Sequence, residues 1–205
     1  MTFLKTVAAT AAIAVMGVSA QAATLDFVAE AAGNERGVAD GTVIAMDGVN
    51  VKFSAGKNNE APGPVNFAYF DDLSGGKPGG LGVCSFLDSN DQCTPSSDDN
   101  VSAGEWVKLA FDYAVELSGL VFGASDHGDI NPNGTLKING VGMTFAQASS
   151  MSFVGDEIKF KYGGGNAKQF YIRAATVSPV PVPAAGYLLI AGIGGLVAMK
   201  RRKKA

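Results

Sequence analysis

The sequence is poor in the residues that most often carry chemistry at protein sites. Its 205 residues include one histidine, His127, and two cysteines, Cys84 and Cys93. This shortage of histidine and cysteine partners argues against a zinc site. The separation of nine positions between the cysteines excludes a C-x-x-C redox pair. The sequence also contains no G-x-S-x-G motif, so it lacks this signature of a serine nucleophile.

Positive charge is scarce in the middle of the chain. All 19 acidic residues but only ten of the 16 basic residues lie within residues 23–183, which leaves this part with a net charge of −9. Nucleic-acid binding requires a basic face on the domain itself. We therefore expect no nucleic-acid partner.

Long helical patterns are absent between the two ends, and apolar residues alternate with polar ones instead. Segment 49–54 alternates in this way, and the period of two recurs at 107–111, 158–162 and 170–174. Turn sequences such as Pro-Gly-Gly separate these segments. Such a pattern is typical of half-buried antiparallel strands. We predict an all-β fold for residues 23–176, an antiparallel β-sandwich or jelly-roll-like domain.

The first 22 residues have the three parts of a secretory signal peptide. Lys5 provides positive charge, residues 6–18 are small or apolar, and Ser-Ala-Gln-Ala at 19–22 places small residues before a cleavage point. We expect a helical signal peptide over residues 1–22 that is removed on export. The competing interpretation is an apolar first helix of the fold itself.

The C-terminus also has three parts. Residues 177–183 form a proline-containing stalk, and the end of this stalk contributes to the motif Val180, Pro181, Val182, Pro183 and Ala184. An uncharged run of 16 residues follows, and then the basic tail Lys200, Arg201, Arg202, Lys203 and Lys204. As a helix the run spans about 24 Å, against roughly 30 Å of hydrocarbon in a bilayer. We predict one short transmembrane helix within 184–205, with the basic tail in the cytoplasm and the β-domain outside.

This C-terminal segment resembles the PEP-CTERM class of bacterial sorting signals, and most of all its VPLPA-CTERM variant, with Val182 in place of the usual leucine. The resemblance covers residues 180–204. It implies a Gram-negative host that makes exopolysaccharide. It also implies an exosortase-type membrane enzyme that cuts near the motif and moves the domain from the inner membrane to the cell surface or the medium. The competing interpretation is a permanent single-pass anchor.

A disulfide between Cys84 and Cys93 is the favoured interpretation of these two cysteines, because we expect the chain to be exported to an oxidising compartment. Closing so short a loop would stabilise the fold by roughly 2–3 kcal/mol in the chain-entropy model. The bond would also fix the loop 85–92 onto the strand that precedes it.

One acidic loop contains part of a calcium-binding pattern. Asp129, Asn131, Asn133 and Gly134 match the first half of a D-x-[DN]-x-[DN]-G loop. The match then fails, because Gly140 stands at the twelfth position, where a bidentate glutamate is required. The alternative is that Asn133 and Gly134 form only a hairpin turn. Calcium at Asp129, Asn131 and Asn133 is the one cofactor that the sequence suggests.

We expect no enzymatic activity. No pair of acidic residues is singled out by its spacing for glycoside hydrolysis, and a lone histidine in a polar loop is usually solvated. We prefer a non-catalytic surface or matrix protein associated with exopolysaccharide, because it requires only the two terminal signals and a β-domain. The alternatives are a secreted carbohydrate-binding module, for which Trp106 is the one tryptophan, and a polysaccharide-acting hydrolase.

Overall fold

The structure, a computed structural model, describes residues 21–58 and 65–180. Most of the predicted signal peptide (1–22) and of the sorting motif, of which only Val180 is included, lies outside the described residues, as do the transmembrane helix and the basic tail. Among the described residues, no helix is both long and apolar enough to cross a membrane.

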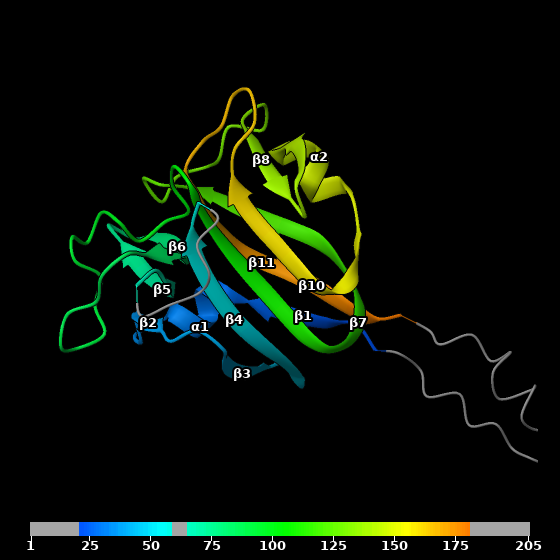
Figure 1. The fold of residues 1–205 in the computed structure, drawn as a ribbon, viewed down its shortest axis with the longest axis horizontal. Coiled ribbons are helices and arrows are strands. Elements are labelled where there is room, and N and C mark those ends of the chain that lie inside the picture. The colour runs from blue at the N-terminus through cyan, green and yellow to red at the C-terminus, as the bar shows by residue number, and fades with distance from the viewer. Residues whose placement is uncertain (1–20, 59–64, 181–205) are drawn as a thin grey trace, which may run out of the picture.

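Eleven strands and two short helices make up the part of the chain that the structure describes (Figure 1). Every pair of strands is antiparallel, so the prediction of an all-β, antiparallel fold is confirmed. The elements follow in this order: β1 (Ala23–Asp26), α1 (Phe27–Ala31), β2 (Arg36–Val38), β3 (Thr42–Met46), β4 (Val49–Lys57), β5 (Phe67–Ser74), β6 (Lys77–Cys84), β7 (Glu105–Ala124), β8 (Thr135–Ile138), β9 (Val141–Thr144), α2 (Phe145–Ser150), β10 (Phe153–Tyr162) and β11 (Phe170–Pro179).

The strands form one hydrogen-bonded network that curls around a core. Its main path is β2-β5-β6-β11-β7-β10-β8-β9, while β1 pairs with β11, and β4 pairs with both β3 and β7. The first half of β7 pairs with β4 and its second half with β11, while β10 pairs with both halves. The layers of this sandwich-like domain are therefore parts of one curved sheet.

The bend in β7 falls where its side chains stop alternating between core and surface. Residues 112–114 are all exposed, and the register against β10 shifts at this point, between Gly155 and Glu157. An irregularity of this kind bends a strand and increases its twist. The two halves of β7 can therefore belong to different layers.

Edge-to-face contacts between aromatic rings link the elements around the core. The ring of Phe122 on β7 lies 5.1 Å from that of Phe145 on α2 and 5.9 Å from that of Phe170 on β11. At the other side of the core, the ring of Phe53 on β4 lies 5.1 Å from that of Phe70 on β5. Burying one such side chain contributes on the order of 2–3 kcal/mol, so these rings fix β5 and β11, which carry the polar site described below.

The predicted disulfide is confirmed: Cys84, the last residue of β6, is bonded to Cys93, with 5.7 Å between their Cα atoms. The bond packs beside the ring of Tyr69 and the side chain of Leu87. The backbone N–H of Cys93 donates to the Tyr69 hydroxyl, which donates in turn to the carboxylate of Glu35. The loop that follows β6 is thus held against β5 by the disulfide and by hydrogen bonds.

Replacing both cysteines by alanine should lower the free energy of unfolding by about 2–3 kcal/mol, because the unfolded chain regains the entropy of the closed loop. Urea unfolding of the purified protein measures this change. Reduction of the wild type with dithiothreitol serves as the control and should lower its stability to that of the variant. A variant as stable as the oxidised wild type would contradict the prediction.

Candidate functional site

The candidate site lies on the face of β5 and β11 that is turned away from the main core. Phe70 on β5 and Ile172 on β11 belong to the core. Because side chains alternate along a strand, their neighbours Asp71 and Tyr171 lie on the opposite face. Asp71 and Tyr171 are nevertheless only 5 % and 0 % exposed. This part of the sheet is therefore buried on both faces.

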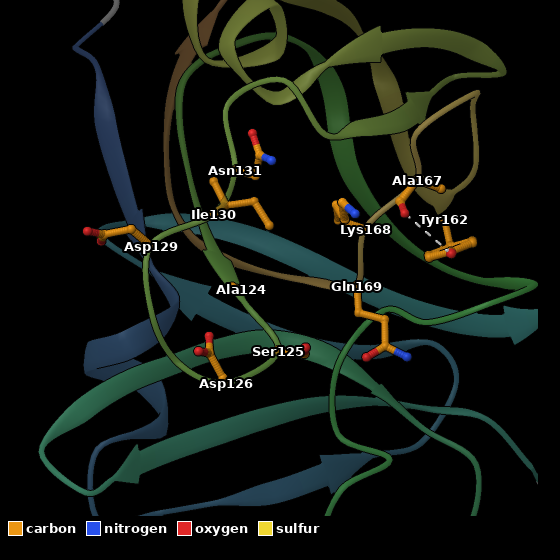
Figure 2. A pocket seen from close by; sticks show the side chains of 10 residues that line it. All are labelled: Ala124, Ser125, Asp126, Asp129, Ile130, Asn131, Tyr162, Ala167, Lys168 and Gln169. Atoms are coloured by element: carbon orange, nitrogen blue, oxygen red, sulfur yellow. Dashed lines mark hydrogen bonds between the residues drawn. The ribbon is translucent and has the colours of Figure 1, made fainter.

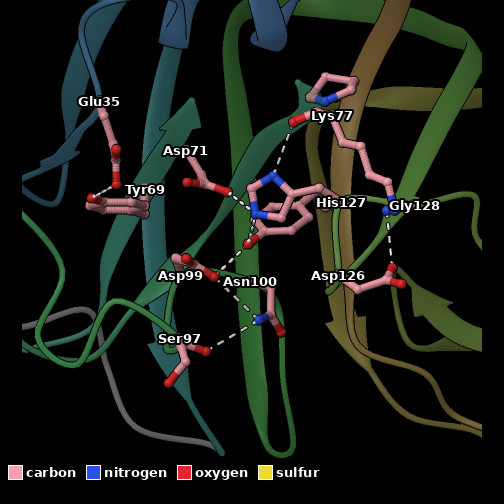
Figure 3. A network of polar contacts seen from close by, with 12 residues as sticks. Glu35, Tyr69, Asp71, Lys77, Ser97, Asp99, Asn100, Asp126, His127 and Gly128 are labelled. Carbon is pink, nitrogen blue, oxygen red and sulfur yellow. Dashed lines mark hydrogen bonds and ion pairs between the residues drawn. The ribbon is translucent and has the colours of Figure 1, made fainter. Parts of the chain in front are cut away.

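Two loops cover this face and bring further polar groups to it (Figure 3). Asp99 comes from the loop between β6 and β7, and His127 from the loop between β7 and β8. The His127 Nε2 atom lies 3.0 Å from Asp71 Oδ2 and 3.4 Å from the Tyr171 hydroxyl oxygen. The Tyr171 hydroxyl donates a short hydrogen bond to Asp99 Oδ1. We call these four buried residues the Asp–His cluster.

Glycines on β6 allow the covering loop to approach the sheet this closely. A Cβ atom on Gly82 would overlap the carbonyl oxygen of Asp99 and would lie 2.8 Å from the Cα of Asn100. A Cβ on Gly79 would lie 2.6 Å from the carbonyl oxygen of Asp71. The Pro-Gly-Gly sequence here was predicted to form a turn, but it lies within strand β6, where any larger residue would push the neighbouring backbone away.

The imidazole of His127 is held in one orientation by its surroundings. Its Nδ1 lies 3.3 Å from the carbonyl oxygen of Lys77, to which only a protonated Nδ1 can donate. The guanidinium of Arg173 donates to the carbonyl oxygens of His127 and Gly128, at 2.8 and 2.9 Å, and so fixes the loop backbone. With Nδ1–H directed at Lys77, the Nε2 atom is left facing Asp71.

Burial and mutual repulsion disfavour negative charge in the Asp–His cluster. Loss of hydration and the nearby charge of Asp99 raise the pKa of Asp71 to about 7. Burial likewise raises the pKa of Asp99, although hydrogen bonds from Tyr171 and Asn100 oppose this shift. Burial and the charge of Asp99 raise the pKa of the Tyr171 hydroxyl. The cluster therefore favours taking up positive charge, either a proton or a cation.

The cluster is reached from solvent through an open hollow of about 420 Å³, which Asp99 and His127 help to line. Serines and amides form much of the remaining wall. A second open hollow, of about 450 Å³, lies beside the first and includes Asp129 and Asn131 (Figure 2). The first hollow gives a small, polar ligand a route to the Asp99 carboxylate and the His127 imidazole, behind which Asp71 lies.

The predicted calcium residues Asp129, Asn131 and Asn133 are all exposed. The side chains of Asp129 and Asn131 point in different directions in Figure 2. Asn131 Oδ1 accepts a hydrogen bond from the backbone N–H of Asn133, and the Asn131 carbonyl accepts one from Gly134. The chain therefore makes a turn here, although not the hairpin turn of the alternative, because β8 pairs with β9 and β10 and not with a strand that precedes the turn. Calcium binding stays a prediction.

Sequence reasoning missed the Asp–His cluster. The expectation of a solvated histidine is wrong, because His127 is 9 % exposed. The signal that could have been used is the pair of adjacent aromatic residues on each strand, Tyr69 with Phe70 and Phe170 with Tyr171. Large apolar residues at successive positions indicate a strand buried on both faces, whereas alternation alone suggested one solvent-facing side.

Comparison with protein-family models, curated proteins and solved structures finds no match to this chain.

Replacing Tyr171 by phenylalanine should lower the free energy of unfolding by about 1–3 kcal/mol, because it removes one of the two side-chain hydrogen bonds, the shorter one, to the buried Asp99 carboxylate. Tyr113→Phe is the matched control, since Tyr113 lies on β7 and is 49 % exposed. Chemical unfolding of both variants measures the difference. Equal stability of the two variants would show that the Tyr171 hydroxyl contributes nothing.

Proposed function

We propose that the chain is an exported, non-catalytic protein of the cell surface or extracellular matrix, with a jelly-roll-like β-domain. In this proposal the C-terminal segment anchors a precursor in the inner membrane, with the domain in the periplasm. An exosortase-type enzyme then cleaves near the motif at 180–184. The proposal is based on the two terminal sequences. The arrangement of the two ends of the domain supports it.

The observation that carries the proposal is the pairing of the first strand with the last. Ala23, which directly follows the expected leader cleavage point, pairs with Val177 of β11, and Thr24 pairs with Thr176. The two ends of the domain therefore leave it side by side (Figure 1). Removal of segments 1–22 and 181–205 would leave all eleven described strands in place.

Two further observations agree with this proposal. The disulfide between Cys84 and Cys93 is of a kind that persists in oxidising compartments such as the periplasm. The Asp–His cluster lies at the start of β11, whereas the chain leaves the domain at the end of this strand. Tyr171 and Pro179 are eight residues apart, which corresponds to about 26 Å along a strand. The cluster and its hollow would thus be remote from the anchored end.

Association with exopolysaccharide is supported by a row of lysines on an otherwise acidic domain. Lys108 on β7 is directly opposite Lys159 on β10, and Lys161 on β10 is directly opposite Lys137 on β8. All four lie on one face of the sheet, because opposed residues and residues two apart share a face. We call them the lysine row. Like charges placed directly opposite one another are unfavourable. Glu157 pairs with Lys108 at 2.7 Å and offsets one of the four charges, and an anionic polymer would relieve the repulsion that remains.

A carbohydrate-binding module that stacks sugars on Trp106 receives less support. The Trp106 side chain is only 3 % exposed, and the Lys159 amine lies 3.7 Å from the centre of its ring. This cation–π contact occupies the face that a sugar would need. We therefore propose recognition of polysaccharide by charge rather than by stacking.

Cleavage near the sorting motif predicts where the C-terminus of the mature protein lies. Mass spectrometry of the protein recovered from the surface or medium of its native host should find a C-terminus near residue 184, without the basic tail. Replacing Pro181 and Pro183 together by alanine should leave the tail in place, and Pro179→Ala, outside the motif, is the control. An exported wild type that still ends in Lys204 and Ala205 would support a permanent anchor instead.

The lysine row predicts binding to an acidic polysaccharide such as alginate. Replacing Lys159 and Lys161 together by glutamine should weaken binding about tenfold, a loss of roughly 1.4 kcal/mol, and binding of the wild type should weaken with salt. The double variant Lys77→Gln with Lys168→Gln removes the same charge from exposed positions outside the row and is the control. Affinity electrophoresis measures both. Equal weakening in the two variants would contradict a specific site.

A further inference from the structure

We propose that Asp71, Asp99 and His127 form a binding site for one divalent transition-metal cation, with Zn²⁺ as the best fit. The proposal concerns the folded domain alone and does not depend on how the chain is sorted. It differs from the predicted calcium site at Asp129, Asn131 and Asn133, with which it shares no residue.

The donor atoms of the three side chains converge. One carboxylate oxygen from each aspartate and one imidazole nitrogen all lie within 4.8 Å of one another. His127 Nε2 lies 3.0 Å from Asp71 Oδ2. This separation is close to the roughly 3.3 Å between neighbouring ligands of a tetrahedral zinc ion, since zinc lies about 2.0–2.2 Å from each ligand.

Asp71 carries the observation that most directly indicates a missing partner. Its Oδ2 atom is buried and receives no hydrogen bond. His127 Nε2 is close to it, but the contact does not have the direction of a hydrogen bond. A buried carboxylate oxygen without a hydrogen bond is destabilising, because the burial removes its water and nothing replaces the lost hydrogen bonds. A cation between Nε2 and Oδ2 would satisfy both atoms at once.

The surroundings of the three ligands are those that metal sites use to orient their side chains. The Nδ1–H of His127 is directed at the carbonyl oxygen of Lys77, which leaves the lone pair of Nε2 for the metal. The Tyr171 hydroxyl donates to Asp99 Oδ1, which leaves the other oxygen of this carboxylate for coordination. Arg173 holds the loop that carries His127. Each ligand is thus positioned before a metal arrives.

The composition of the site favours a transition metal over calcium. Calcium prefers six to eight oxygen ligands, whereas imidazole nitrogen with carboxylate oxygen suits zinc and its neighbours. Three protein ligands leave a fourth position, which water can fill from the hollow lined by Asp99 and His127. The low count of histidine and cysteine argued against zinc only because two distant aspartates were not considered as ligands.

The single histidine provides a direct test on the wild type. Because His127 is the only histidine of the chain, its ring C2–H proton gives a single, unambiguous NMR signal. The full chain is purified in mild detergent with its disulfide formed, treated with a chelator and titrated with Zn²⁺. We expect the signal to move to a new position, complete at one equivalent, and the midpoint of thermal unfolding to rise by several degrees.

Variants of the ligands and of the calcium loop separate this site from others. Asp71→Asn keeps the size of the side chain but removes its charge and should weaken Zn²⁺ binding at least about 100-fold. Asp129→Asn removes one exposed acid from the predicted calcium loop and should leave Zn²⁺ binding unchanged. Co²⁺ substitution adds a spectroscopic test, since its visible absorption bands should be present in wild type and Asp129→Asn but absent in Asp71→Asn.

Two outcomes would overturn the proposal. The first is a His127 signal that Zn²⁺ does not move. The second is binding that Asp71→Asn leaves unchanged, which would indicate zinc held elsewhere. If Asp71→Asn fails to fold, Asp99→Asn replaces it, and the wild-type titration still decides.

Discussion

The fold depends on the length and bend of β7. Its 20 residues, Glu105–Ala124, pair with β4, β10 and β11 in turn. A straight strand of this length would produce a flat, extended sheet with two exposed faces. The bend at 112–114 instead turns the two halves toward different layers, and the apolar faces of β4, β10 and β11 then enclose one core. The first and last strands also come together, because the edge of β11 that faces away from β7 pairs with β1.

The second face of the sheet has a different chemistry, and glycine makes it possible. On β6, Gly79 and Gly82 have no side chains, so the backbone near Asp71 and the loop at Asp99 can lie against the strand. The space that an ordinary side chain would fill is occupied by a loop fixed at one end by the Cys84–Cys93 disulfide. Polar groups that would otherwise be hydrated are buried there together. The unusual pKa of Asp71 and the affinity for a cation that we propose both result from this burial.

Several features could be predicted from local sequence because their causes are local. Alternation of apolar and polar residues gave the strands at 49–54, 107–111, 158–162 and 170–174. The Cys84–Cys93 bond was predictable because these are the only two cysteines of a chain that is expected to be exported. The prediction from sequence failed for side chains that are buried by segments distant in the chain. β5 and β11 pack on the core with one face, and loops from elsewhere in the chain cover the other. Neither the period of the strands nor the spacing of residues along the sequence predicts this second cover.

The sequence by itself determined the class of the fold, because alternation along each strand is a local pattern, and the pairing of the only two cysteines; the two end signals remain predictions from residue order. Only the tertiary structure decided that Asp71, Asp99, His127 and Tyr171 meet. These residues lie on two strands and two loops, the first and last of them 100 positions apart. Their approach results from the curl of the sheet, the glycines of β6 and the path of the covering loops. The Asp–His cluster exists only in the folded protein, because in an unfolded chain water would hydrate each of these residues separately.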